Sequence, residues 1–214
     1  MSKTTGLPVD ERQETAGKKA AGILSYLVEP VTLLLPDLLP GTRVLQIGLR
    51  ACCWAECFAG RECKLVGVDP ADTAVEAARR VCPQGRFQKM NVTEDLCERL
   101  AEEPFDLVVS LEFVEHLYSP GQWAEACFRA LKPGGRLVCS TPYYGYLKNL
   151  LIGVVDKWDE HFSALSEGGH VKFFSRKTLT QLLGGVGFQA IRFRGAGRLP
   201  YLWKSMVVSA DRSE

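Results

Sequence analysis

The chain has 214 residues, 46% of them hydrophobic and 24% charged, which is enough for one globular domain with a sizeable core. Its formal net charge is +1, and lysine and arginine are scattered along the sequence. This distribution lacks the basic stripe or patch of a nucleic-acid-binding protein, so the sequence excludes nucleic acid as the expected partner.

The first twenty residues are polar and charged, and they predict a flexible N-terminal arm (1–20) followed by a single domain (21–214). They contain no apolar core of a signal peptide, so we expect a cytoplasmic protein whose eight cysteines are reduced thiols. The most apolar stretch, residues 22–41, carries Glu29, Asp37 and three prolines. It therefore does not predict a membrane-spanning helix, but short helices broken at Pro30 and Pro36.

From residue 43 onward, strand and helix patterns alternate. Each strand candidate is short and rich in β-branched or large apolar residues, as expected for strands covered on both faces. The five candidates in this part of the chain are 43–47, 64–68, 86–92, 106–111 and 136–141. Helical segments lie between them at 71–81, 93–103 and 119–131, with Asp72 or Thr73 as the expected cap of the first and Ser119 as that of the third.

One more helix is predicted at 175–188, and it is followed by two strands at 188–195 and 205–210. The connection between these two strands is short, which allows an antiparallel hairpin and hence a reversed strand at the end of the sheet. Alternating strands and helices indicate βαβ units and a mainly parallel α/β sheet.

In open parallel sheets, ligands bind beyond the carboxyl ends of the strands. Asp69 ends the second strand about twenty residues after the first turn, where a carboxylate is placed to accept two ribose hydroxyls. The alternative role for Asp69 is capping the next helix. Asn91 ends the third strand candidate, where its carbonyl could accept an adenine amino hydrogen, or where it could simply form a turn.

The segments "VLQIG", "VGVDP", "FDLVVSLEFVEHL", "LKPGGRLVCSTP", "GHVKFFS" and "LLGGVGF" occur in this order. Over residues 40–210 the chain resembles the class I S-adenosylmethionine-dependent methyltransferases, and it is similar to the ubiquinone-pathway O-methyltransferases among them. The resemblance implies a Rossmann-like three-layer sandwich whose seven-stranded, mostly parallel sheet has its last strand antiparallel. It also implies S-adenosylmethionine as cofactor, with its methionine over the first turn and its ribose on Asp69. The adenine would lie beside Asn91 and Val92, and Leu111 would end the fourth strand at the same site.

The chain departs from this family at the first turn. Family members usually have an acidic residue where this chain has Gln46, followed by three alternating glycines of which only Gly48 is kept. Arg50 and Cys52 replace the other two. Glycines at such positions permit a positive φ and a close approach of the backbone to a ligand. Arg50 could pair with the cofactor carboxylate, or its side chain could fill that subsite and exclude the cofactor.

Acid–base candidates follow the fourth strand. Glu112, Glu115 and His116 have i, i+3, i+4 spacing and would share one face of a helix. The resemblance brings His170 to the same rim and also implies a divalent-metal site on Glu112, Glu115 and His116. The alternatives are a general base, His116 or His170, and a polar network that only joins two loops. His161 lacks such neighbours and is expected at the surface.

The segment 143–170 is long and aromatic for a connection, and it predicts a cap over a substrate pocket. The residues expected to form its roof are Tyr143, Tyr144, Tyr146, Leu150, Leu151 and Val155. Residues 146–155 could instead fill a small separate core or touch a membrane surface, although Lys148 and Lys157 are few charges for the latter.

Together these features predict methyl transfer from S-adenosylmethionine to the oxygen or nitrogen of a small, aromatic or apolar acceptor. The alternative is a non-catalytic binding or scaffold protein whose altered turn, at Gln46, Arg50 and Cys52, has lost the cofactor. A nicotinamide-dependent oxidoreductase would need Gly-x-Gly-x-x-Gly after the first strand, and only Gly48 fits.

Overall fold

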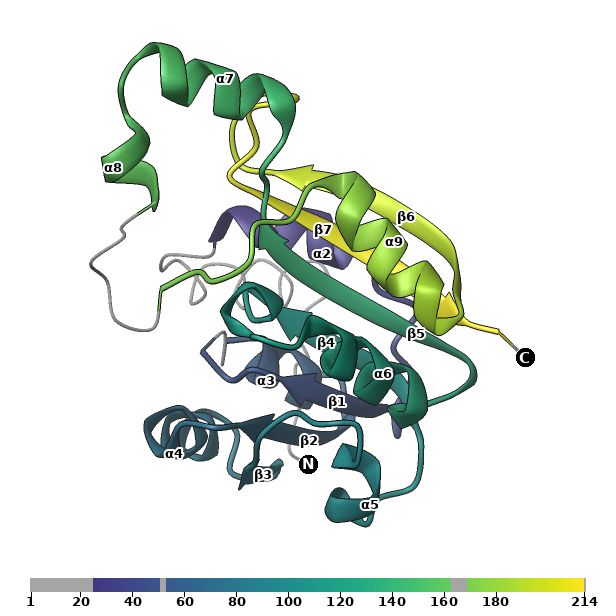
Figure 1. The fold of residues 1–214 in the computed structure, drawn as a ribbon. Helices are drawn as coiled ribbons and strands as arrows, with labels where there is room; N and C mark the ends of the chain where they lie inside the picture. Colours follow the sequence, from purple (N-terminus) through teal and green to yellow (C-terminus); the bar gives the residue numbers. More distant parts are fainter. Residues whose placement is uncertain (1–24, 51–52, 163–168, 214) are drawn as a thin grey trace, which may run out of the picture.

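The computed structural model describes residues 25–50, 53–162 and 169–213 (Figure 1). The expected arm 1–20 and Cys52 lie outside these residues. The described chain forms one seven-stranded sheet with the strand order β3-β2-β1-β4-β5-β7-β6. The strands are β1 (Arg43–Ile47), β2 (Lys64–Asp69), β3 (Arg86–Lys89), β4 (Phe105–Leu111), β5 (Leu131–Pro142), β6 (Phe188–Ala196) and β7 (Ser205–Arg212).

Strands β1 to β5 run parallel, whereas β7 pairs antiparallel with both β5 and β6. The predicted Rossmann-like sheet with a reversed last strand is therefore confirmed. Two boundaries differ from the prediction. Strand β3 has only β2 as a neighbour and its register ends at Lys89, so Asn91 lies in the loop beyond it. Strand β5 begins at Leu131 and reaches its regular register through a bulge beside β4.

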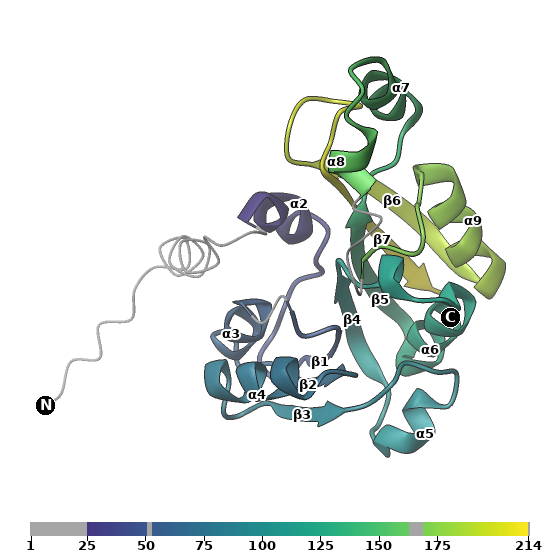
Figure 2. The same ribbon diagram turned by 60° about the vertical axis from the view of Figure 1, so that its left-hand side comes forward.

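Helices cover both faces of the sheet and give three layers (Figure 2). Alternate residues of a strand point to opposite faces, so Val44 packs in one core cluster and Leu45 in the other. The cluster around Val44 includes residues of α2 (Val28–Thr32), α3 (Cys53–Ala59) and α4 (Asp72–Val81). The cluster around Leu45 includes residues of α5 (Leu96–Leu100), α6 (Pro120–Ala130) and α9 (Arg176–Val186).

The predicted helix ends were only partly right. Pro30 does not break a helix but lies in the first turns of α2, after the 3₁₀ helix η1 (Ser25–Leu27), where a missing N–H is tolerated. Ser119 is the N-cap residue of α6 but makes no capping hydrogen bond. The cap of α4 is Ala71 rather than Asp72 or Thr73. Ser175 and Thr178 form a capping box at α9.

The segment after β5 forms α7 (Tyr146–Val154) and α8 (Trp158–Phe162), which stand beyond the carboxyl end of the sheet beside the β6–β7 loop (Figures 1 and 2). The Lys148 ammonium donates to the carbonyl oxygens of Tyr143 (2.8 Å) and Lys204 (3.4 Å), which fixes α7 against that loop. Among the described helices, none combines the length and the hydrophobicity needed to cross a bilayer.

Candidate active site

The first turn is held by a glycine and a carboxylate. Gly48 has a φ of +84°, and a Cβ at this position would lie 2.6 Å from the ring of Phe113. Only glycine therefore fits there without displacing the loop after β4. The Asp69 carboxylate accepts the N–H of Leu49 at 2.7 Å and that of Ala71 at 2.8 Å. It ties the first turn to the start of α4.

Asp69 does not cap α4, whose N-cap residue is Ala71, but it has a structural role in joining the two turns. Its side chain is buried at the end of β2, yet a carboxylate can accept about four hydrogen bonds and only two are used by these N–H groups. Val92 is buried and Asn91 is exposed in the loop after β3, while Leu111 is buried at the last position of β4. Ribose and adenine binding at these residues stays a prediction.

The two described residues that depart from the family pattern have different surroundings. Gln46 is buried within β1, and its Nε2 donates to the carbonyl oxygen of Gly48 at 3.4 Å. Arg50 is exposed in the turn that follows β1. Its positive charge adds to the lowering of the His170 pKa, which is due mainly to burial, and partly opposes the raised pKa of Glu115.

Glu112 adopts an unusual backbone conformation at the end of β4. Its φ is +49°, so Glu112 does not share a helix face with Glu115. The 3₁₀ helix η2 spans only Val114–His116. The Glu112 carboxylate accepts the hydroxyls of Ser140 at 2.8 Å and Ser205 at 3.0 Å. Burial raises the pKa of Glu112 despite these two bonds.

Glu115 is a fully buried carboxyl group. Neither of its oxygens has a hydrogen-bond partner among the described residues, although the neighbouring Thr141 hydroxyl opposes the shift of its pKa. Burial, assisted by the negative charge of Glu112, raises the pKa of Glu115 to about 8. Near neutral pH this group is therefore a protonated acid.

Backbone hydrogen bonds bring His170 to His116. The Glu115 carbonyl oxygen accepts the N–H groups of Val171 (2.9 Å) and Lys172 (3.0 Å), which holds the segment after residue 168 against η2. The two imidazole rings lie 5.1 Å apart between centroids. His116 Nδ1 is 3.3 Å from the Gly169 carbonyl oxygen, which can only accept, so this nitrogen carries a proton.

The structure forms a different potential metal-binding group from the one implied by the resemblance. Ligand atoms of Glu115, His116 and His170 lie within 4.8 Å of one another, a spacing compatible with one divalent cation. Glu112 is not part of this group, because its oxygens are directed to Ser140 and Ser205. Burial and the charge of His116 lower the pKa of His170, so its imidazole is neutral near pH 7.

Some of the residues expected to form the roof line cavities. Tyr144 is buried, and its hydroxyl forms a hydrogen bond with His170 Nδ1 at 3.2 Å. With Trp158, Phe162 and Phe173 it lines a cavity of about 520 Å³. Tyr143 packs in the core, and Leu151 and Val155 line a second cavity. Tyr146 and Leu150 are exposed. Membrane contact through 146–155 stays a prediction.

Sequence reasoning missed three residues near this site. Lys148 is 4% exposed although it lies in an apolar helix, and its position as the single charge within 146–154 was the available signal. Arg198 belongs to the β6–β7 loop, where no sequence pattern marked it. His161, expected as an isolated surface residue, is half-buried and lies 6.3 Å from the Tyr144 ring. These three side chains line the second cavity.

Comparison with known proteins identifies the family. A family model described as a methyltransferase domain matches residues 19–192. The ubiquinone biosynthesis O-methyltransferase of Roseobacter denitrificans is 31% identical over 183 residues, covering 83% of this chain and 72% of the relative. That of Ruegeria pomeroyi is 30% identical over 181 residues, covering 81% of this chain and 70% of the relative.

Solved structures share the fold at lower identity. The N-methyltransferase NodS of Bradyrhizobium japonicum, solved with S-adenosylhomocysteine, has a TM-score of 0.62 at 16% identity, covering 95% of this chain and 99% of that one. Magnesium protoporphyrin IX methyltransferase of Synechocystis also scores 0.62 at 16% identity, covering 99% of this chain and 90% of that one. The chain belongs to the class I S-adenosylmethionine-dependent methyltransferases.

Proposed function

We propose that this methyltransferase modifies an oxygen or nitrogen atom of a small acceptor with an aromatic or apolar body. The observation that carries the proposal is the position of His170, which joins the group formed by Glu115 and His116 to the aromatic cavity lined by Tyr144. Oxygen is the favoured atom, because the curated relatives described above are named as O-methyltransferases.

Asp69 fits the cofactor, because its carboxylate retains acceptor capacity beyond its two backbone bonds. Asp69 would hold the ribose, and Asn91 with Val92 would lie at the adenine. When bound, S-adenosylmethionine supplies an electrophilic methyl group on a sulfonium. The chain's own task is then to align the acceptor and to remove its proton.

His170 is the proposed general base. It is exposed on the cavity side, and its lowered pKa keeps the imidazole neutral and able to accept a proton near pH 7. Burial raises the pKa of Tyr144 to about 12, so its hydroxyl stays protonated. The Tyr144 oxygen can accept the Nδ1–H of His170, and this tautomer leaves the lone pair on Nε2 to take the proton of the acceptor. Glu115, His116 and His170 are also the residues that would hold a divalent cation, which would act by lowering the pKa of an acceptor hydroxyl.

The acceptor class is tested with two aromatic probes, 2-naphthol and 2-naphthylamine, and the readout is S-adenosylhomocysteine formed above the acceptor-free rate. We expect stimulation by 2-naphthol or 2-naphthylamine but not by glycerol. The variant His170→Asn should lower kcat by about 100-fold or more, the usual contribution of a general base, while the Kd for S-adenosylhomocysteine stays constant.

The matched control is His161→Asn, which removes an imidazole that lines the second cavity but is not part of the group of Glu115, His116 and His170. A lost contact with the acceptor there would raise KM, whereas kcat should stay close to that of the parent. If neither aromatic probe stimulates turnover in protein that binds S-adenosylhomocysteine, the proposed acceptor class is wrong. If His161→Asn and His170→Asn lower kcat equally, His170 is not the base.

A further inference from the structure

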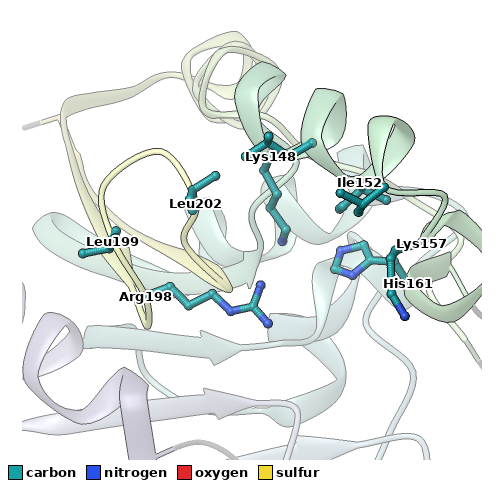
Figure 3. A pocket seen from close by; sticks show the side chains of 9 residues that line it. Lys148, Ile152, Lys157, His161, Arg198, Leu199 and Leu202 are labelled. Atoms are coloured by element: carbon teal, nitrogen blue, oxygen red, sulfur yellow. The ribbon is translucent and has the colours of Figure 1, made fainter.

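A cavity of about 690 Å³ lies beneath the cap, between α7, α8 and the β6–β7 loop. Figure 3 shows the side chains of Lys148, His161 and Arg198 entering it from these three elements. Apolar side chains, among them Leu151 and Leu202, complete the lining. The cavity therefore combines an apolar surface with cationic groups, in the size range of sites for small organic ligands.

The positive charges of Lys148 and Arg198 have no carboxylate partner among the described residues. The described part of the chain contributes no carboxylate to the lining. The acidic group that acts on Lys148 is Glu112, whose oxygens accept two serine hydroxyls instead of an ammonium hydrogen. No ion pair joins Arg198 to a described carboxylate, and Arg198 and Lys148 repel each other. An anion in the cavity would relieve this repulsion.

Both cationic residues are in energetically unfavourable positions. Lys148 is almost fully buried, and burial together with the charge of Arg198 lowers the pKa of Lys148 to about 8. Arg198 has a φ of +72°, a conformation that is unfavourable for a residue with a Cβ. Backbone conformations of this kind concentrate at ligand-binding sites, where the surrounding structure maintains them.

We propose that this cavity binds a carboxylate carried by the acceptor substrate. The proposal rests on the methyltransferase function above and names the class of its acceptor: an aromatic or apolar molecule with a nucleophilic hydroxyl at one end and a carboxylate at the other. The Arg198 guanidinium offers two parallel N–H donors to the carboxylate oxygens, and the Lys148 ammonium adds a second positive charge.

Tyr144 connects the two ends of this site. Its hydroxyl bonds to His170, its ring lies 6.3 Å from that of His161, and the Lys148 ammonium lies 5.4 Å from the centre of the same ring. An acceptor lying along Tyr144 would thus present its hydroxyl to His170 and its carboxylate to Lys148 and Arg198. This arrangement would fix which hydroxyl of the acceptor is methylated.

The experiment compares the Kd of 6-hydroxy-2-naphthoate with that of 2-naphthol, its analogue without the carboxylate, by fluorescence titration of the full chain. We expect 6-hydroxy-2-naphthoate to bind at least about tenfold more tightly than 2-naphthol, the effect of a hydrogen bond to a charged group. Arg198 is exposed, so Arg198→Gln should fold normally. It should remove most of this preference and leave the Kd of 2-naphthol unchanged.

The matched control is Arg192→Gln, the same substitution at an exposed arginine of β6 outside the cavity, which should keep the full preference. Equal affinities for the two probes, or an equal loss of both in Arg198→Gln, would overturn the inference. Titration of the same protein with S-adenosylhomocysteine distinguishes a failure of the methyltransferase function from a failure of the carboxylate site. Failure of that titration contradicts the methyltransferase function, whereas equal probe affinities in protein that binds S-adenosylhomocysteine contradict only the carboxylate site.

Discussion

Replacing Asp69 with alanine is expected to weaken S-adenosylhomocysteine binding by about 1.5–3 kcal/mol, the contribution of a hydrogen bond to a charged group. The structure adds a second effect. The substitution also removes the acceptor of the Leu49 and Ala71 N–H groups, so the free energy of unfolding should fall by about 1–3 kcal/mol for each donor left unsatisfied. Binding is measured by isothermal titration and stability by urea denaturation.

Asp72→Ala provides the control for this prediction. Asp72 lies three residues further along but is exposed, and its ion pair with Lys89, at 2.6 Å, joins two solvent-exposed side chains. Such pairs contribute little, so both binding and stability should stay close to those of the parent. If folded Asp69→Ala binds S-adenosylhomocysteine as tightly as the parent does, the ribose is not held at Asp69.

The buried Glu115 carboxyl should make the protein less stable as pH rises. Its pKa is raised from 4.5 to about 8 in the folded chain, so folding retains a proton that the unfolded chain releases. The stabilisation is complete below the unfolded pKa and is lost as pH rises through the folded pKa. Between about pH 5 and pH 8 the free energy of unfolding should decrease by up to about 1.4 kcal/mol per pH unit.

Glu115→Gln isolates this effect, because glutamine keeps the shape of the protonated acid and cannot ionise. Denaturation is followed from pH 5 to pH 9 after treatment with EDTA, so that no metal ion bound by Glu115, His116 or His170 changes the titration. The stability of the parent relative to this variant should decline across that range. Parallel pH profiles for the two proteins would show that Glu115 ionises as an ordinary exposed carboxyl.

The strand pattern predicted the fold because strands that are buried on both faces are recognisable in the sequence as runs of mostly apolar residues. Residues 43–47 and 106–111 are mostly apolar, and they form the central strands β1 and β4. The prediction failed at the edge of the sheet. The sequence 86–92 continues to look like a strand, yet β3 has one neighbour and its pairing ends at Lys89 opposite Asp69.

The site was predicted less completely, because its geometry depends on loops. The polar residues at the strand ends were recognisable, and the structure does bring Glu115, His116 and His170 together. Their assumed helical face failed at Glu112, whose left-handed backbone turns its carboxylate toward Ser140 and Ser205. Neither serine could be assigned from spacing, since they come from β5 and β7.

The cationic cavity was not predictable from local sequence. Lys148, His161 and Arg198 lie on α7, α8 and the β6–β7 loop, and they meet only because Lys148 anchors α7 to the carbonyl oxygens of Tyr143 and Lys204. The position of Arg50 in the first turn was predictable from the sequence. Its two alternative roles, pairing with the cofactor carboxylate and obstructing the cofactor subsite, are distinguished by binding experiments.

Isothermal titration of the unmodified chain with S-adenosylhomocysteine and S-adenosylmethionine tests the central claim most directly. The claim is that the carboxyl edge of the sheet, with Gly48 and Asp69 in place, still holds the cofactor although Arg50 stands in its turn. We expect saturable binding of both ligands with one molecule bound per chain. Flat titrations with both, from protein shown to be folded by circular dichroism, would contradict this account.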